Sequence, residues 1–193
     1  MLAVCGLLPC LAASPDVDKG KILGSLSAPI QIEVYSDFEC PACKTFHEQM
    51  LPRIVQDYVI PGRVVVVSHE FPLNIAAHKY SREAANYATA AARLGSGIYQ
   101  PVTDALFRNQ VSWEMTGKVW ETVSAVLSAE QQKKVQALVN DPSVLAEVQH
   151  DVEAGNREHV NSTPSLFITR PRHMALPWPM NYSLLQSLLN GLK

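Results

Sequence analysis

Two cysteines lie close together where a strand-like segment gives way to a helix-like one. Residues 30–35 are rich in β-branched and aromatic side chains and predict a buried strand, whereas residues 44–58 predict a helix. The motif Cys40-Pro41-Ala42-Cys43 falls between them, in the first helical turn. Unpaired N–H groups and the positive end of the helix dipole favour a thiolate over a thiol there. The junction therefore predicts thiol redox chemistry.

The two cysteines are expected to have different roles. Cys40, at the exposed start of the helix, is the predicted nucleophile of a mixed disulfide, and Cys43, one turn further in, is predicted to resolve it. Pro41 suits the first helical turn because it lacks an N–H that would have no partner. Ala42 carries no charge, so no side chain between the two sulfurs stabilises the thiolate.

The charges around the motif set an expectation for the acidity of Cys40. Asp37 and Glu39 are nearby anions and are expected to oppose the thiolate, whereas the helix terminus favours it. We therefore predict a Cys40 pKa below the free value of about 8.5, yet well above about 3.5, the value of the most acidic thiols of this kind.

A Cys-x-x-Cys pair can also be half of a zinc site, which needs two further ligands. The sequence has no second such pair and no suitably spaced pair of histidines. The redox interpretation is therefore favoured, and we expect that the protein needs no metal and no organic cofactor.

Charge and length narrow the class of protein. The 193 residues contain 16 Lys and Arg against 18 Asp and Glu, without the basic block that a nucleic-acid surface needs. Nucleic acid is therefore not a predicted partner. The length allows one large domain, or a domain that carries an insertion.

Residues 1–14 form an apolar segment that ends in small residues and resembles a secretory signal, although the usual positive leader is missing. The alternatives are a truncated start, a short membrane anchor, a lipid-modified cysteine (Cys5 or Cys10) or a merely hydrophobic terminus. Removal of this segment would leave only Cys40 and Cys43, and in an oxidising compartment such a pair would be oxidised or cycling. We expect an exported protein, periplasmic or otherwise extracytoplasmic.

The rest of the pattern predicts an α/β fold. A short edge strand is expected near residues 21–23, and residues 63–68 predict a second buried strand, parallel to the first because a helix connects them. Residues 76–158 have helical patterns, and residues 165–169 predict a third strand. The predicted parts are the apolar segment 1–14, a first part 15–75, an inserted helical subdomain 76–158 and a second part 159–193.

Local chemistry marks the starts of three predicted helices. Ser128 and Gln131 form a capping box, and Asp141 followed by Pro142 offers a cap and a proline in the first turn. Asn181 is expected to cap the last helix. These starts do not depend on any tertiary contact.

The order and spacing of four motifs resemble one family of redox proteins. The motifs are Glu33-Val34-Tyr35-Ser36-Asp37-Phe38, Cys40-Pro41-Ala42-Cys43, Glu70-Phe71-Pro72-Leu73 and Ser162-Thr163-Pro164-Ser165. From about residue 28 onwards, the chain resembles the DsbA-like thiol-disulfide oxidoreductases of the thioredoxin superfamily. The resemblance implies a thioredoxin-like fold with an inserted all-helical subdomain, and an exported enzyme that acts on protein thiols.

The same resemblance implies a second half of the site. Thr163-Pro164 would be a cis peptide bond packed against the cysteine pair, where the neighbouring backbone can pair with a bound peptide. It further implies that thiol-containing client proteins are the substrates and that a membrane quinone-linked partner reoxidises the enzyme.

One position departs from the family pattern. Many relatives carry a buried carboxylate six residues before the first cysteine, where this chain has Val34. Glu33 is one residue away and should face the opposite side of the sheet, because strand side chains alternate. The proton-moving function is therefore absent, or water or Glu70 takes it over.

Several other side chains have two interpretations. Helical spacing places His47 on the face of the two cysteines, where a protonated ring would favour a thiolate; otherwise it is an ordinary helix histidine. Phe38 belongs either to an apolar surface for unfolded clients or to an exposed stack on a helix. His69 and His78 are expected to be structural. The tryptophans expected to pack in or around the core are Trp113, Trp120 and Trp178.

The sequence as a whole predicts a dithiol oxidase. The oxidised Cys40–Cys43 pair would accept a thiolate from a client, form a mixed disulfide through Cys40 and leave the client oxidised. Because Ala42 is uncharged, a disulfide isomerase or reductase stays open, as does a non-catalytic peptide-binding chaperone module on the same fold. A glutathione-linked isomerase is disfavoured, since such enzymes generally do not need the second cysteine.

Overall fold

The computed structural model describes residues 19–192. The predicted leader at residues 1–14, with Cys5 and Cys10, lies outside the described residues. Among residues 19–192, no helix combines the length and the apolar character needed to cross a membrane.

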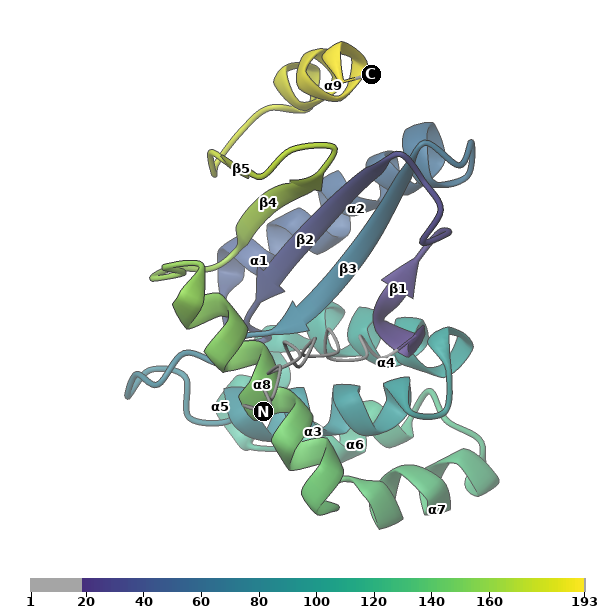
Figure 1. The fold of residues 1–193 in the computed structure, drawn as a ribbon. Helices are drawn as coiled ribbons and strands as arrows, with labels where there is room; N and C mark the ends of the chain where they lie inside the picture. Colours follow the sequence, from purple (N-terminus) through teal and green to yellow (C-terminus); the bar gives the residue numbers. More distant parts are fainter. Residues whose placement is uncertain (1–18, 193) are drawn as a thin grey trace, which may run out of the picture.

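Within the described residues, a mixed sheet of five strands has the order β1-β3-β2-β4-β5 (Figure 1). The strands are β1 (Ile22–Leu23), β2 (Ile30–Ser36), β3 (Val64–Glu70), β4 (Ser165–Arg170) and β5 (Met174–Leu176). As predicted, β2 and β3 are parallel; the other neighbouring pairs are antiparallel. β2 therefore lies in the middle of the sheet, and none of its residues is exposed. The strand that leads to the cysteines is a rigid central one.

The helix after the cysteines runs without a break but changes its winding three times. Its consecutive parts are α1 (Pro41–Thr45), the π-helical η2 (Phe46–Met50), α2 (Leu51–Ile54) and the π-helical η3 (Val55–Val59). Pro52 has no N–H to donate to the carbonyl of Glu48, and η2 ends two residues before Pro52. The predicted helix is present, and it begins with the cysteine motif itself.

Six further helices lie between β3 and β4 in the described chain and fill the lower half of Figure 1. They are α3 (Ser81–Ala92), α4 (Ser96–Arg108), α5 (Gln110–Thr116), α6 (Val119–Ser124), α7 (Ala129–Leu138) and α8 (Pro142–Arg157). The helical pattern was expected to begin at residue 76, but α3 begins at Ser81. The backbone N–H groups of Leu73 and Tyr80 donate to Asp37 and Glu39, which holds the preceding loop in a non-helical path.

The predicted caps are confirmed. Ser128 and Gln131 form the reciprocal capping box of α7, and Asp141 accepts from Ser143 N–H at the start of α8. Asn181 accepts from Leu184 N–H at the start of the last helix, α9 (Tyr182–Gly191). Each cap occupies a helix terminus whose N–H groups lack a helical partner.

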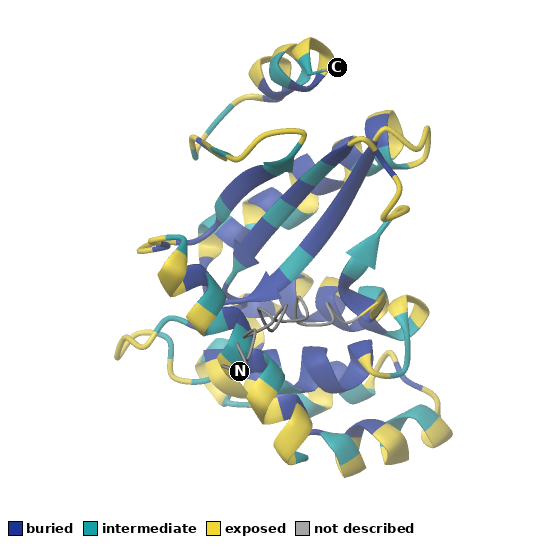
Figure 2. Ribbon diagram, in the orientation of Figure 1, coloured by how far each residue is buried: buried dark blue, intermediate teal, exposed yellow. Residues whose placement is uncertain are grey.

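Two large apolar clusters divide the core. One lies between the sheet and the helical segments η2, α2, η3 and α9, and includes Ile32, Ile54 and Leu185. The other fills the six-helix block and reaches up to the cysteine motif, where it includes Cys40 and Cys43. In Figure 2 most of the central strands β2, β3 and β4 and the inner faces of these helices are coloured as buried. The cysteine motif therefore sits where the sheet meets the helical insertion.

The three tryptophans pack as expected. Trp113 is fully buried in the helical cluster, and Trp120 stacks on Tyr87 at a centroid distance of 5.4 Å. Trp178 packs edge-on against Phe46 at 5.5 Å.

A buried ionic cluster joins the short 3₁₀ turn η1 (Lys19–Lys21) to α8 and β3. Lys21 Nζ lies 2.9 Å from Asp151 Oδ2 and 3.1 Å from Glu147 Oε1, and the Lys21 side chain is only 2% exposed. The other Asp151 oxygen lies 2.9 Å from Nδ1 of His69. The first described turn is thus tied to a helix 130 residues further along the chain.

Candidate active site

The cysteine motif begins α1 at the end of the central strand. Cys40 is the N-cap of α1 in an extended conformation, and Pro41 occupies the first helical turn, as predicted. Cys40 is 8% exposed, whereas Cys43 is fully buried. Both are thiols, with their sulfurs near each other but not bonded. Only the first sulfur can thus be reached from outside the protein.

Thr163 and Pro164 lie directly against the first cysteine. The Sγ atom of Cys40 donates a hydrogen bond to the carbonyl oxygen of Thr163 over 3.2 Å, across a sequence separation of 123 residues. The Thr163–Pro164 peptide bond is cis. Both residues are buried, so the loop before β4 forms one wall of the site.

The surroundings of Cys40 favour its thiolate and lower its pKa to about 5. The hydrogen bond from the Cys43 thiol is the largest cause; burial opposes it, while the Thr163 side chain and the N–H groups of Cys43 and Ala42 add to it. The Thr163 hydroxyl is buried and has no other hydrogen-bond partner in the described structure, so it is available to a thiolate. The pKa of Cys40 lies within the predicted interval, but the helix N–H groups are not its main cause.

Cys43 has the opposite properties. Burial is the largest factor and raises its pKa well above the ordinary thiol value, and the interaction with Cys40 raises it further. The backbone N–H of Asp37 contacts the Cys43 sulfur at 3.4 Å. One acidic, reachable thiol and one buried, protonated thiol fit the two roles predicted for them.

Asp37 connects the cysteine loop to the segment after β3. Its Oδ1 accepts hydrogen bonds from Glu39 N–H over 2.8 Å and from the Ser81 hydroxyl over 2.7 Å. Its Oδ2 accepts from Leu73 N–H over 2.7 Å and from His78 Nδ1 over 2.8 Å. Four hydrogen-bond donors therefore offset the cost of burying this carboxylate. From the sequence, Asp37 was expected only to oppose the thiolate.

His78 brings a basic group to the same place. Burial lowers its pKa, but the hydrogen bond to Asp37 and the charges of Asp37, Glu39 and Cys40 together raise it above the ordinary value. Sequence reasoning interpreted His78 as structural. Its contact with the cysteine loop spans 41 residues and leaves no local signal in the sequence.

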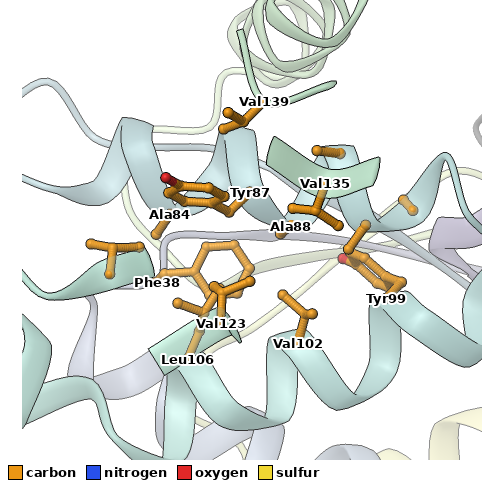
Figure 3. Packing of buried hydrophobic residues seen from close by; sticks show 14 of the residues in the cluster. Phe38, Ala84, Tyr87, Ala88, Tyr99, Val102, Leu106, Val123, Val135 and Val139 are labelled. Carbon is orange, nitrogen blue, oxygen red and sulfur yellow. The ribbon is translucent and has the colours of Figure 1, made fainter. Parts of the chain in front are cut away.

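The helical insertion holds the residue just before the motif. Phe38 is 3% exposed, its ring packs on Phe107 at a centroid distance of 4.8 Å, and its carbonyl accepts from Gln110 Nε2 over 2.6 Å. Figure 3 shows Phe38 among side chains such as Ala84 and Leu106 of the surrounding helices. Phe38 therefore lies in the core, so the apolar client surface and the exposed stack on a helix are both wrong.

His47 is directed to the insertion and not to the sulfurs. Its Nε2 lies 2.7 Å from Asp104 Oδ1, and its ring lies 4.6 Å from that of Phe107. Lys44 Nζ, one turn earlier, donates to the carbonyl of Arg108 over 3.1 Å. These residues fasten the cysteine helix to α4.

Glu33 and Glu70, the carboxylates considered as proton carriers, are not hydrogen-bonded to the cysteine pair in the described structure. Val34 packs in the cluster with η2 and α2, whereas Glu33 faces the other side of the sheet, 3.3 Å from His69, as alternation predicts. Glu70 is fully buried and accepts from the Tyr99 hydroxyl over 2.9 Å; burial raises its pKa to about 7. No hydrogen bond within residues 19–192 joins Glu70 to either cysteine.

A family model described as Thioredoxin matches residues 16–190. Two curated proteins are among the similar sequences. The Na(+)/H(+) antiporter NhaA 1 of Mycolicibacterium gilvum is 29% identical over 179 residues, which are 91% of this chain but 27% of that protein. The probable disulfide bond formation protein D of Bacillus cereus is 24% identical over 153 residues, which are 76% of this chain and 68% of that protein. The likeness to the antiporter thus concerns only one part of it.

Solved structures share the fold. Alpha-DsbA1 of Wolbachia pipientis has a TM-score of 0.74 at 19% identity and covers 94% of this chain and 93% of its own. BdbD of Bacillus subtilis has a TM-score of 0.75 at 17% identity and covers 91% of this chain and 94% of its own. At such identities the likeness establishes the fold.

Proposed function

The chain belongs to the thioredoxin family, and from that premise we propose that it is a DsbA-like thiol-disulfide oxidoreductase that works as a dithiol oxidase on client proteins. The proposal depends above all on the acidity of Cys40, whose pKa is lowered to about 5. The corresponding thiol has a pKa of about 7 in thioredoxin, a reductant, and about 3.5 in DsbA, an oxidant. An acidic thiol stabilises the reduced site, which makes its disulfide more oxidising.

The reaction begins with the oxidised Cys40–Cys43 disulfide. A client thiolate attacks the Cys40 sulfur, a client–Cys40 disulfide forms, and the bond to Cys43 breaks. The Cys43 sulfur takes the electron pair and then a proton, in line with its raised pKa. A second client thiolate attacks the client sulfur and expels Cys40 as a thiolate. The client leaves with one disulfide, and the two cysteines hold the two electrons.

The loop at Thr163 has a positioning role in this scheme. Its carbonyl contacts the Cys40 sulfur, and its unpartnered hydroxyl can donate to the thiolate that is expelled. We assign Cys40 as nucleophile, Cys43 as resolving thiol, and Thr163 and Pro164 as the wall beside which a client backbone pairs. The reduced enzyme then needs an oxidant, for which a membrane quinone-linked partner in an extracytoplasmic compartment is our proposal.

The equilibrium reduction potential against glutathione tests the direction of electron flow. We expect a value closer to the −120 mV of DsbA than to the −270 mV of thioredoxin. A potential near the thioredoxin value would show that the protein is a reductase and not an oxidase.

A second experiment separates catalysis from client binding alone. Cys40→Ser and Cys43→Ser should each abolish oxidation of a dithiol client. When the client is supplied in its disulfide form, the Cys40 thiolate of Cys43→Ser attacks it, releases one client thiolate and accumulates as the mixed disulfide, because the resolving thiol is missing. If Cys40→Ser assists client folding as well as the unaltered protein does, the chain is a peptide-binding chaperone module and not an oxidase.

A further inference from the structure

A groove of about 650 Å³ opens beside the cysteine site. One wall is formed by the segment that leads from β3 into α3, the other by the end of α8 and the loop that follows it. Both segments lie at the left of Figure 1. Apolar side chains that include Phe71, Leu73 and Val160 line part of the groove. Its size suits several residues of an extended peptide.

The charged side chains of the groove, Lys79 and Arg82, are both positive. His78, Lys79 and Arg82 line it, and none of its lining residues within the described chain is an Asp or Glu. Arg82 donates to the neutral Gln149 over 3.3 Å, and Lys79 lies over the Tyr80 ring at 4.9 Å. Neither Lys79 nor Arg82 forms an ion pair with a carboxylate of residues 19–192. Charge complementarity therefore favours an anionic occupant.

Two residues connect the groove to the thiols. His78 donates to Asp37, whose backbone N–H contacts the Cys43 sulfur. Asn161, on the other wall, precedes by two residues Thr163, whose carbonyl accepts from Cys40. Because an extended chain advances about 3.3 Å per residue, a client held beside Thr163 reaches the groove within two or three residues of its reacting cysteine.

We propose that this groove binds an extended client segment with acidic side chains about two to four residues from the reactive cysteine. The acidic side chains contact Lys79 and Arg82, and an apolar neighbour rests against the wall formed by Phe71 and Leu73. The proposal builds on the proposed oxidase function, for which it names a preferred class of substrate.

The test uses three synthetic peptides that share two cysteines and differ at two flanking positions, which are Glu, Gln or Lys. The rate constant for a single turnover by the oxidised protein is measured for each. We expect the Glu peptide to react about tenfold faster than the Lys peptide at low salt, with the difference shrinking as salt is added. The charge reversal Lys79→Glu with Arg82→Glu should invert the order of the Glu and Lys peptides.

The matched control is Lys133→Glu with Lys134→Glu on α7, which makes the same change of charge at exposed positions that do not line the groove. It should preserve the order of the three peptides. Equal rates for all three peptides, or equal effects of the two charge reversals, would overturn the groove proposal.

Failure of the proposed oxidase function has a separate signature. In that case even the Gln peptide is not oxidised by the unaltered protein. Binding of fluorescent forms of the peptides to Cys40→Ser, followed by anisotropy, then decides the groove proposal by itself. Tighter binding of the Glu peptide that the Lys79 and Arg82 reversal abolishes supports the groove, and equal binding of all peptides rejects it.

Discussion

The Nδ1 atom of His78 lies 2.8 Å from Oδ2 of Asp37, and the backbone N–H of Asp37 lies 3.4 Å from the sulfur of Cys43. A basic side chain from the loop before α3 is thereby coupled to the cysteine site. Ala42 brings no charge to the motif, and this histidine is a basic group, with a raised pKa, supplied from another part of the chain. The pKa of His78 is raised in part by the charge of Cys40. Since such an interaction acts on both partners equally, a protonated His78 must favour the Cys40 thiolate.

Replacing His78 by Gln should raise the pKa of Cys40 above about 5, because the amide can still donate to Asp37 but carries no charge. Titration of the thiolate ultraviolet absorbance measures the change. His173→Gln serves as control, since His173 is exposed and paired with Glu158 away from the motif. If the two variants titrate alike, His78 holds Asp37 in place without acting on the thiol.

Replacing Cys43 by Ala should raise the pKa of Cys40 more than any other single change at the motif. The hydrogen bond from the Cys43 thiol is the largest cause of the lowered value. The same absorbance titration detects it, with Cys40→Ala as the control that shows no thiolate near pH 5. If Cys40 still titrates near pH 5 in the Cys43→Ala variant, then the helix N–H groups and Thr163 are the main cause of its lowered pKa.

The stability of the reduced protein should depend on pH through Cys40. Its pKa is about 5 in the folded protein and about 8.5 in an unfolded chain. A lowered pKa stabilises the fold above the unfolded value, and this contribution is lost as the pH falls through 5. The melting temperature of the reduced protein, measured relative to that of the oxidised one, should therefore rise between pH 5 and about 8.5. A flat difference over this range would contradict the assignment.

Replacing Gln110 by Leu should destabilise the protein by about 1–3 kcal/mol, because the buried Phe38 carbonyl loses its 2.6 Å partner. Urea unfolding measures the loss. Gln49→Leu, at an exposed position of η2, should change the unfolding free energy far less. The Gln110 variant should also react more slowly with clients, since Phe38 leads directly into the motif. Equal stability of the two variants would mean that another group satisfies the carbonyl.

Replacing Asp151 by Asn should cost about 3–5 kcal/mol, because Lys21 and His69 lose the anion between them. The pKa of Asp151 is lowered to about 2. Its contribution to stability is therefore fully present above about pH 4 and is lost as the pH falls through about 2. The pKa of His69 is raised to about 9, so its contribution is present below about 6.5 and is lost as the pH rises through 9. The difference in unfolding free energy between Asp151→Asn and the unaltered protein should therefore be largest between about pH 4 and about pH 6.5. Glu153→Gln, exposed on the same helix, is the control.

The sequence predicted what short-range chemistry determines. Alternation along β2 placed Glu33 and Val34 on opposite faces, and the caps Ser128, Asp141 and Asn181 need only their immediate neighbours. The contacts it missed join distant segments.

Two such contacts illustrate the limit. The pair Lys21 and Asp151 spans 130 residues, and the contact between Asp37 and His78 spans 41. His47 has suitable helical spacing for the thiols, yet its direction depends on Asp104, which belongs to another helix. Spacing along one helix places a residue on a face but does not say what the fold brings against that face.

The hydrogen bond from Gln110 to the Phe38 carbonyl, with those of His47 and Lys44 to α4, attaches the reactive helix to the insertion at three points. The insertion therefore supports the reactive segment directly. A shortened chain in which a short linker replaces residues 81–157 would expose one whole side of the reactive segment and would remove Asp151, the anion between Lys21 and His69. In the full chain, displacement of the insertion would expose Phe38 and the buried cysteine motif together.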